Sequence, residues 1–247
     1  MKRRDAFTMT ELLVLIAAST MLGALLVASL GDAKQKAQAA VCASNLRQIG
    51  VAISMYANDH NDYYPPGYVA AVGDWPLFIG PYLGKHQISY GQGPFDSSRA
   101  FLCPSGVQSG AYNGLPVRLM YSAHPTLMPS ANFAGSNLYR RSRVSRASEI
   151  ILIGDGAQQT AYYAGSFDSA AEFDAINQAF ITYPDNQPDR VMTQAGMAGA
   201  NSDDNRSASY LRFRHYGNTV ANFLFCDGHV EWMAFGQVKQ RNFYYDP

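Results

Sequence analysis

Three residues in the C-terminal part of the chain carry side chains that bind zinc or move protons: His215, Asp227 and His229. Imidazole and carboxylate groups are zinc ligands, and the same groups act as general acids and bases. The local sequence also offers a structural interpretation, which we prefer. Asp227-Gly228 is a turn dipeptide, His229 begins the strand after it, and His215 can hydrogen-bond the backbone near that turn. The pattern therefore favours structural roles over catalysis.

Other patterns of enzyme chemistry are absent from the sequence. It contains no Gly-x-Ser-x-Gly, His-Glu-x-x-His, P-loop or dinucleotide-binding motif, and its cysteines show no zinc-binding spacing. The formal net charge is zero and charged residues make up 15% of the chain, so nothing attracts it to nucleic acid. We therefore expect no enzymatic activity, no cofactor and no nucleic-acid partner.

One carboxylate, Glu11, stands near the start of an apolar run that extends from residue 7 to residue 30. A run of about twenty apolar residues crosses a bilayer as a helix. An ionised carboxylate within such a helix is costly and calls for a partner. Lys2, Arg3 and Arg4 precede the run and should remain in the cytoplasm.

The small residue Ala6 suggests how the carboxylate finds its partner. In a secretory signal the small-residue cleavage site follows the apolar core, whereas Ala6 precedes it. Cleavage between Ala6 and Phe7 would leave the helix attached and place a new amine four residues before Glu11. The amine and the carboxylate of neighbouring subunits could then pair, which would offset burial and set the axial register of the helices.

The stretch KRRDAFTMTELLVLIA resembles the leader and helix start of type IV pilins and type II secretion pseudopilins. The resemblance implies cleavage before Phe7 by a membrane-embedded prepilin peptidase, methylation of the new amine, and a glutamate at the fifth mature position, which Glu11 occupies. Ala6 stands where that family usually has glycine. The resemblance further implies a single pass through the bacterial inner membrane, with the N-terminus cytoplasmic and the head periplasmic. Inner-membrane machinery would then assemble the chain with copies of itself or other pilin-like subunits into a cell-surface or periplasmic filament.

Four further segments resemble the prepilin-type processing-associated family of large heads. They are residues 42–50 (CASNLRQIG), residues 101–105 (FLCPS) and the pair of RHYG and FCDGHV near the C-terminus. The signature of that family is a histidine, nine residues, then Asp-Gly. Here eleven residues separate His215 from Asp227 and Gly228.

The elements that position these residues follow from periodicity. Residues 7–58 are predicted to form one helix, transmembrane in its first half and amphipathic in its second, where Leu46, Ile49 and Ile53 share a face. The run from Glu149 to Gly154 is predicted to be a buried strand. We expect an α+β, pilin-like fold, with the long helix packed against a globular head that contains an antiparallel β-sheet. The expected divisions are a leader at 1–6, the helix at 7–58 and the head at 59–247.

A hairpin is predicted from strands at residues 220–226 and 229–235, which flank the Asp-Gly dipeptide. A two-residue turn there places Phe225 opposite Val230 and Phe223 opposite Trp232. These two pairs would form one apolar face of the ribbon.

The three cysteines, Cys42, Cys103 and Cys226, permit one intrachain disulfide and leave one thiol over. In an oxidising compartment a bridge between Cys42 and Cys103 would tie the head to the helix. The alternative is that all three are small buried apolar residues.

Two alternative functions stay open at this point. One is a membrane-tethered enzyme or carbohydrate-binding domain that uses a pilin-like anchor. The other is a head stabilised by Ca²⁺, as resemblance to major pseudopilins allows, with ligands among Asp203, Asp204 and their neighbours.

Overall fold

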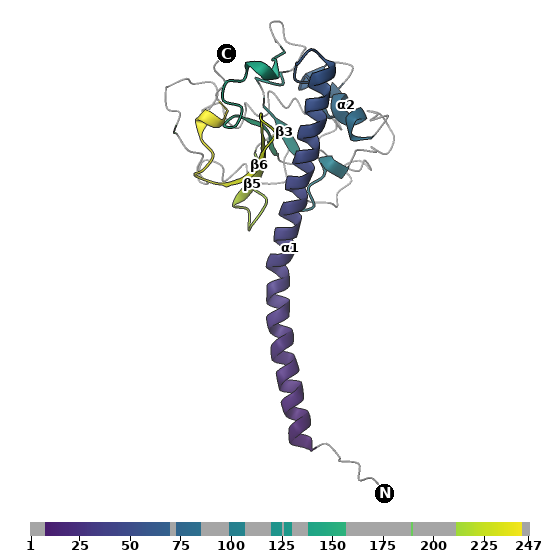
Figure 1. Ribbon diagram of the computed structural model, residues 1–247. Coiled ribbons are helices and arrows are strands. Elements are labelled where there is room, and N and C mark those ends of the chain that lie inside the picture. The colour runs from purple at the N-terminus through teal and green to yellow at the C-terminus, as the bar shows by residue number, and fades with distance from the viewer. Residues whose placement is uncertain are drawn as a thin grey trace, which may run out of the picture. The chain divides into compact units, whose positions relative to one another are not determined.

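A long N-terminal helix and a head with a four-stranded antiparallel sheet make up the protein, which confirms the predicted α+β class (Figure 1). The computed structural model describes residues 8–69, 73–84, 99–106, 120–124, 126–129, 138–156, 189 and 211–243. The chain divides into two compact units, Met1–Ala37 and Gln38–Pro247. The second half of the long helix therefore belongs to the same unit as the sheet.

The helices and strands follow one another in the order α1 (Met9–Asp59), β1 (Tyr68–Val69), β2 (Gly73–Asp74), α2 (Trp75–Ile79), β3 (Tyr121–Ala123), β4 (Ile151–Asp155), β5 (Val220–Phe225) and β6 (Val230–Ala234). Four 3₁₀ turns complete the set: η1 (Gly80–Leu83), η2 (Arg99–Phe101), η3 (Arg141–Arg143) and η4 (Gln240–Asn242).

Helix α1 is a single helix of 51 residues. Its predicted stripe is confirmed, because Leu46, Ile49 and Ile53 are all buried against the head. Gly50 lies on the same side, where a Cβ would come within 2.9 Å of a terminal methyl carbon of Leu224 in β5. Glycine at this position therefore permits close approach of helix and sheet.

The chain turns sharply after α1 because Asn61 and Asp62 adopt left-handed backbone conformations, with φ of 54° and 69°. The Asp62 N–H donates to the Ala57 carbonyl at 2.7 Å and caps the helix. The Asp62 carboxylate accepts hydrogen bonds from the Ser142 N–H at 2.9 Å and from Arg141 Nε at 3.1 Å. The bonds from Ser142, followed by the charge of Arg141, lower the pKa of Asp62.

The main sheet has the strand order β3-β4-β5-β6, and every neighbouring pair is antiparallel. Strands β4 and β5 are central and buried along their whole length. Continuous burial explains why β4 begins with three consecutive aliphatic residues, Ile151, Leu152 and Ile153, rather than with an alternating pattern. The sheet separates two hydrophobic cores. One core packs against α1 and includes Leu46, Ile53, Trp75, Phe101, Tyr121 and Leu224. The other includes Ile151, Leu211, Phe213, Phe223, Phe225 and Phe243.

A β-bulge in β4 distributes its side chains between the two cores. Ile151 pairs with Phe225 and Ile153 pairs with Leu224, so the register shifts between the two isoleucines. Ile151 consequently packs in the second core and Ile153 in the core against α1. A regular strand would have placed both isoleucines on one face.

The β5–β6 hairpin exists, but its predicted register was wrong by one residue. Leu224 pairs with Val230 and Asn222 with Trp232. The Phe225 N–H donates to the His229 carbonyl, which leaves a three-residue loop in place of the predicted two-residue turn.

The glycine of the Asp-Gly dipeptide accounts for this loop. Gly228 has φ of 95° and donates its N–H to the Phe225 carbonyl at 2.9 Å. A turn followed by a left-handed glycine is the usual three-residue hairpin connection. The shifted register leaves Trp232 61% exposed rather than in an apolar face.

A fully buried histidine, His124, joins the segment after β3 to the C-terminal part of the head. Its Nε2 lies 2.8 Å from the Phe243 carbonyl, and its Nδ1 accepts from the N–H groups of Thr126 and Leu127, both at 3.2 Å. These contacts assign the proton to Nε2. Burial lowers the pKa of His124 to about 4.

Candidate functional site

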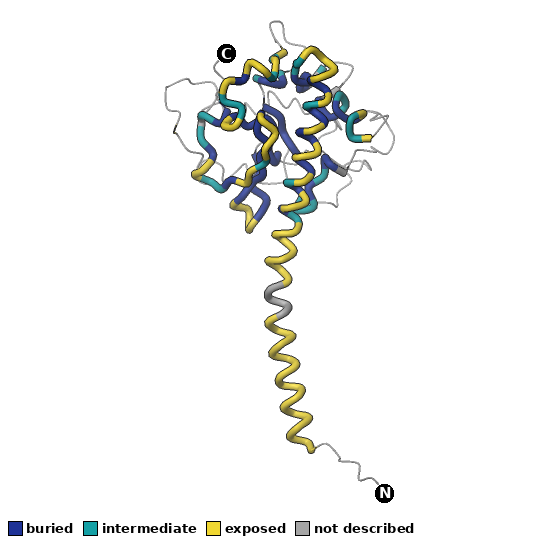
Figure 2. The backbone as a smooth tube through the Cα atoms, viewed as in Figure 1, coloured by how far each residue is buried: buried dark blue, intermediate teal, exposed yellow. Residues whose placement is uncertain are grey.

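The first half of α1 is apolar and exposed on every described side. Large side chains at five consecutive positions, residues 12–16, are each at least half exposed, and burial begins only at Ala39 (Figure 2). Five consecutive residues cover the whole circumference of a helix. This helix is long and apolar enough to cross a membrane. Apolar surface therefore extends around the whole circumference of this segment.

Glu11 has a local partner at the start of α1. The N–H and the hydroxyl of Thr8 both donate to the Glu11 carboxylate at 2.8 Å, and the Glu11 N–H lies 3.3 Å from the Thr8 hydroxyl. Thr8-Met9-Thr10-Glu11 is thus a capping box, in which residues N-cap and N3 satisfy each other's backbone donors. The sequence contains this Thr-x-x-Glu pattern, in addition to the carboxylate that we expected to pair with an amine.

The predicted processing residues, Ala6 and Phe7, lie outside the described residues. So do Asp203 and Asp204, the predicted calcium ligands. The roles of all four stay predictions.

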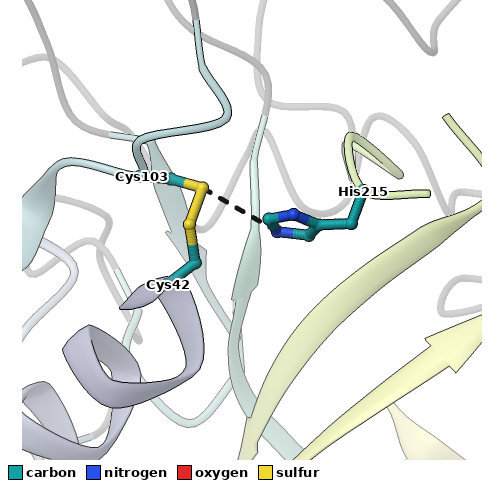
Figure 3. A group of neighbouring side chains, drawn as sticks. All are labelled: Cys42, Cys103 and His215. Atoms are coloured by element: carbon teal, nitrogen blue, oxygen red, sulfur yellow. Dashed lines mark hydrogen bonds between the residues drawn. A yellow bond between two sulfur atoms is a disulfide. The ribbon is translucent and has the colours of Figure 1, made fainter. Parts of the chain in front are cut away.

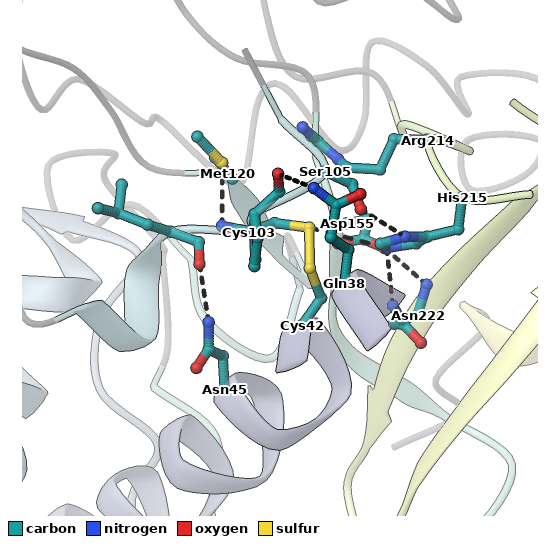
Figure 4. Close-up of a disulfide and its surroundings, with 12 residues drawn as sticks. Gln38, Cys42, Asn45, Cys103, Ser105, Met120, Asp155, Arg214, His215 and Asn222 are labelled. Carbon is teal, nitrogen blue, oxygen red and sulfur yellow. Dashed lines mark hydrogen bonds and ion pairs between the residues drawn. A yellow bond between two sulfur atoms is a disulfide. The ribbon is translucent and has the colours of Figure 1, made fainter. Parts of the chain in front are cut away.

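A disulfide between Cys42 and Cys103 ties α1 to the segment 99–106 (Figure 4). Both cysteines are fully buried. Two hydrogen bonds reinforce the tie on either side of the bridge. Gln38 Nε2 donates to the Pro104 carbonyl at 3.0 Å, and Asn45 Nδ2 donates to the Leu102 carbonyl at 2.7 Å. The sequence left two alternatives, a Cys42–Cys103 bridge or three buried thiols, and the structure contains the bridge.

The third cysteine, Cys226, is a free thiol that follows β5. It is buried, and burial raises its pKa to about 12. A thiol needs its ionised form to act as a nucleophile or metal ligand, so Cys226 is chemically inert at neutral pH.

His215 lies beside the disulfide, buried to 2% exposure (Figure 3). Its Nε2 is 3.8 Å from the Cys103 sulfur, and its Nδ1 is 3.1 Å from the Ser105 hydroxyl oxygen. The backbone of His215 also pairs with Val220 at the start of β5, which holds the ring at the end of the sheet.

Two further polar groups complete this buried cluster: Asp155 at the end of β4 and Asn222 in β5. Asp155 Oδ2 lies 3.1 Å from His215 Nε2 and accepts the Asn222 N–H at 2.7 Å. Asn222 Nδ2 is 2.8 Å from the same His215 nitrogen. Burial, followed by the negative charge of Asp155, raises the pKa of Tyr121 in the neighbouring strand β3.

The structure does not bring His215, Asp227 and His229 together as one site. Asp227 and His229 are exposed in the hairpin loop, where Asp227 Oδ1 accepts the His229 N–H at 3.0 Å and contacts its Nδ1 at 2.6 Å. An aspartate side chain that accepts the N–H two residues later, as Asp227 does from His229, is a local turn contact. The carboxylate beside His215 is Asp155.

Three members of the buried cluster, Ser105, Asp155 and Asn222, were not among the functional residues predicted from the sequence. The available signal was a carboxylate directly after a predicted buried strand, at Asp155-Gly156. An aspartate is almost never buried unless it is paired, so a partner is expected for Asp155, but the sequence does not show which residue that partner is.

Comparison with known proteins identifies a family. Residues 31–172, more than half of the chain, match the model of a family described as "Protein of unknown function (DUF1559)". The chain belongs to this family. No curated protein matches it, and no solved structure does.

The DUF1559 region includes the second half of α1, the disulfide, Ser105 and β4 with Asp155. It ends before His215 and Asn222, so the cluster combines residues from the matched region and from the remainder of the chain.

Proposed function

We propose that this chain is a structural subunit of a filament of the type IV pilus or type II secretion pseudopilus kind, and that it is not an enzyme. A prepilin peptidase would cut between Ala6 and Phe7, and inner-membrane machinery would assemble the processed chain. Its partners in the filament would be copies of itself or other pilin-like subunits.

One observation carries the proposal: a continuous helix begins with an apolar segment whose described side chains are exposed, and its second half is buried against a folded head. An apolar surface of this extent needs a cover, which is lipid before assembly and other helices within a fibre. The continuity of α1 supports the proposal because the apolar segment and the head then share one helix.

The charges before the helix support an orientation for the membrane stage. Lys2, Arg3 and Arg4 favour a cytoplasmic N-terminus, which places the head on the opposite side of the inner membrane. The disulfide between Cys42 and Cys103 suits that side, because disulfides persist in oxidising compartments.

Glu11 would change partners when the filament forms. In the single chain it completes the capping box with Thr8. In the fibre it would pair with the amine of Phe7 on a neighbour, an interaction that requires its negative charge. The two roles separate chemically, since glutamine can complete a capping box but carries no charge.

The test measures incorporation into filaments in cells that express the chain with its peptidase. Glu11→Gln keeps the cap and removes the charge, whereas Thr8→Ala removes the cap and keeps the charge. We expect Glu11→Gln to abolish filaments and Thr8→Ala to retain them, with a cost of about 1 kcal/mol to the helix start.

Mass spectrometry of the membrane-extracted chain accompanies this test and should show Phe7 as a methylated N-terminus. Normal filaments from Glu11→Gln would refute the charge-pairing role. An intact Met1 N-terminus in assembled protein would refute the processing step.

The enzyme alternative has one observation in its favour, the line of a hydroxyl, an imidazole and a carboxylate formed by Ser105, His215 and Asp155. Groups of these types activate a serine nucleophile. An activity-based fluorophosphonate probe on the full-length chain distinguishes the two functions. We expect no labelling of Ser105, and labelling that Ser105→Ala removes would favour the enzyme.

A further inference from the structure

Two exposed aromatic side chains lie together on the surface of the head. Trp232 in β6 is 61% exposed, and Tyr216 in the loop before β5 is 42% exposed. Their ring centroids are 6.4 Å apart, and the ring planes are inclined at 42° to each other. Each ring combines a large apolar body with one polar group, an N–H in tryptophan and a hydroxyl in tyrosine. Single exposed apolar residues are ordinary, whereas a contiguous aromatic pair indicates a contact surface.

The loop that carries Tyr216 is strained and firmly closed. Tyr216 has φ of 47°, in the left-handed region, where a bulky side chain is an outlier. Gly217 and Asn218 continue in the same region, with φ of 71° and 67°. Hydrogen bonds between the backbones of His215 and Val220, at 3.0 and 3.2 Å, close the two ends of the loop. Strain of this kind persists where the surrounding structure imposes it, and it is concentrated at functional positions.

The aromatic pair lies at the end of the head where α1 enters it. His215, which directly precedes Tyr216, has its Nδ1 3.1 Å from the Ser105 hydroxyl oxygen. Gln38 Nε2 donates to the carbonyl of Pro104, the residue directly before Ser105, at 3.0 Å (Figure 4). Gln38 is the first residue of the compact unit that contains the sheet. The loop before β5 is therefore on a level with the first turn of α1 in the head.

Only a short stretch of chain separates the apolar segment from this end of the head. The apolar run ends at Leu30, and the exposed charged residues Asp32, Lys34 and Lys36 follow it. A membrane-spanning helix leaves the hydrocarbon where charged residues begin. Gln38 comes eight positions after Leu30, which is about 12 Å along an α-helix. The headgroup layer extends about 5–8 Å beyond the hydrocarbon on each side. Chain connectivity alone therefore keeps the entry end of the head beside that layer.

We propose that Tyr216 and Trp232 insert into the headgroup layer of the bilayer that α1 spans, so that the head docks on the membrane surface. Tryptophan and tyrosine are enriched in this layer because their rings have an apolar body and a polar tip. Insertion covers the two exposed rings and adds a second contact with the membrane to the one that α1 makes. The inference rests on the membrane stage of the proposed function and does not require filament assembly.

Tryptophan fluorescence tests this contact directly, because the chain contains two tryptophans and only Trp232 is exposed, while Trp75 is fully buried. The full-length chain is placed, one copy per disc, in phosphatidylcholine nanodiscs with or without bromine on the acyl carbons nearest the headgroups. Bromine quenches only a tryptophan that comes close to it. We expect the parent chain to emit less light in the brominated discs. Trp232→Phe should emit equally in both kinds of disc, because Trp75 remains inside the head.

A matched control moves the exposed tryptophan to the other end of the head. Leu138 is exposed, and the carbonyl of its neighbour Tyr139 accepts the N–H of Tyr64, just after the end of α1. The part of α1 between Gln38 and this end is about 30 Å long. Leu138→Trp combined with Trp232→Phe should therefore give emission that bromine does not change.

Substitution of Tyr216 separates docking from packing. Glycine adopts φ of 47° without strain, which offsets its greater freedom in the unfolded chain. Tyr216→Gly should therefore leave the melting temperature of the chain unchanged or higher, while bromine should quench Trp232 less because one of the two inserted rings is gone. A clearly lower melting temperature would make Tyr216 a packing residue, and undiminished quenching would remove it from the contact. Either result overturns the role of Tyr216.

Equal emission of the parent chain in the two kinds of disc overturns the proposal. So does quenching that persists in Trp232→Phe, or equal quenching of the tryptophan placed at position 138. Discs that hold two chains test a second copy as the occupant: protection of Trp232 from aqueous iodide in these discs alone would assign the pair to that copy and overturn membrane docking. A chain that does not enter the discs refutes the membrane stage of the proposed function as well, whereas a chain that enters them without quenching refutes only the docking.

Discussion

Removal of the disulfide should destabilise the head by an amount that its loop length determines. Cys42 and Cys103 are separated by 61 positions in the sequence. Closing a loop of this length in the unfolded chain is worth about 4 kcal/mol in the chain-entropy model. We therefore expect Cys42→Ala/Cys103→Ala to lower the free energy of unfolding by about 4 kcal/mol. For a unit the size of Gln38–Pro247 this corresponds to a melting temperature lower by roughly 8–16 °C.

The assay is thermal unfolding of the oxidised full-length chain in detergent, followed by circular dichroism without added metal. Each single substitution, Cys42→Ala or Cys103→Ala, should cost about as much as the double one, because either breaks the bridge. This non-additivity identifies a coupled pair. Cys226→Ala is the matched control, since it also removes a buried sulfur but should cost only about 1 kcal/mol. A double variant that melts within a few degrees of the control, or single effects that simply add, would refute the reasoning.

Four other substitutions test the helix packing, the buried histidine and the hairpin turn. Gly50→Ala and Gly31→Ala both gain about 1 kcal/mol of helix propensity. The new methyl group at position 50 meets Leu224, so Gly50→Ala should lower the free energy of unfolding by about 1–2 kcal/mol in denaturant titrations. Equal effects of the two substitutions would contradict the close contact between Gly50 and Leu224. Because burial lowers the pKa of His124 to about 4 from 6.5, the unfolded chain binds more protons between these values. The free energy of unfolding should therefore fall by about 3 kcal/mol as the pH decreases from 6.5 to 4. His124→Gln should flatten this part of the stability–pH profile. An unchanged slope in that variant would assign the pH dependence to another group. Gly228→Ala should cost about 1–2 kcal/mol, since alanine is strained at φ of 95°; a neutral effect on the melting temperature would argue against the left-handed turn.

Much of the local structure could be predicted because short-range patterns encode it. The long helix follows from an unbroken run of apolar and helix-forming residues, and α1 ends at Asp59, one residue after the predicted end. The hairpin follows from the Asp-Gly dipeptide between two β-rich segments. Its register did not follow, because the same dipeptide fits a two-residue and a three-residue loop. Packing selects between them, and the three-residue loop turns Trp232 outward.

The buried cluster shows where local patterns stop. His215 and Asp155 are 60 positions apart, and His215 and Cys103 are 112 apart. Nothing in either neighbourhood specifies the other, so the sequence grouped His215 with Asp227 and His229 and did not connect it with Asp155. Asp155 takes that place because β4 pairs with β5 and the bridge of His215 to Val220 brings the imidazole to the end of β4.

By itself the sequence determined the apolar rod, the carboxylate near its start and the positions of the central strands, since each depends on residues within a few turns of one another. Only the tertiary structure decided which cysteines form the bridge, which carboxylate meets the buried histidine and which face each hairpin residue occupies. These choices depend on how α1 packs across the sheet, and that packing is the sum of contacts between residues far apart in the chain.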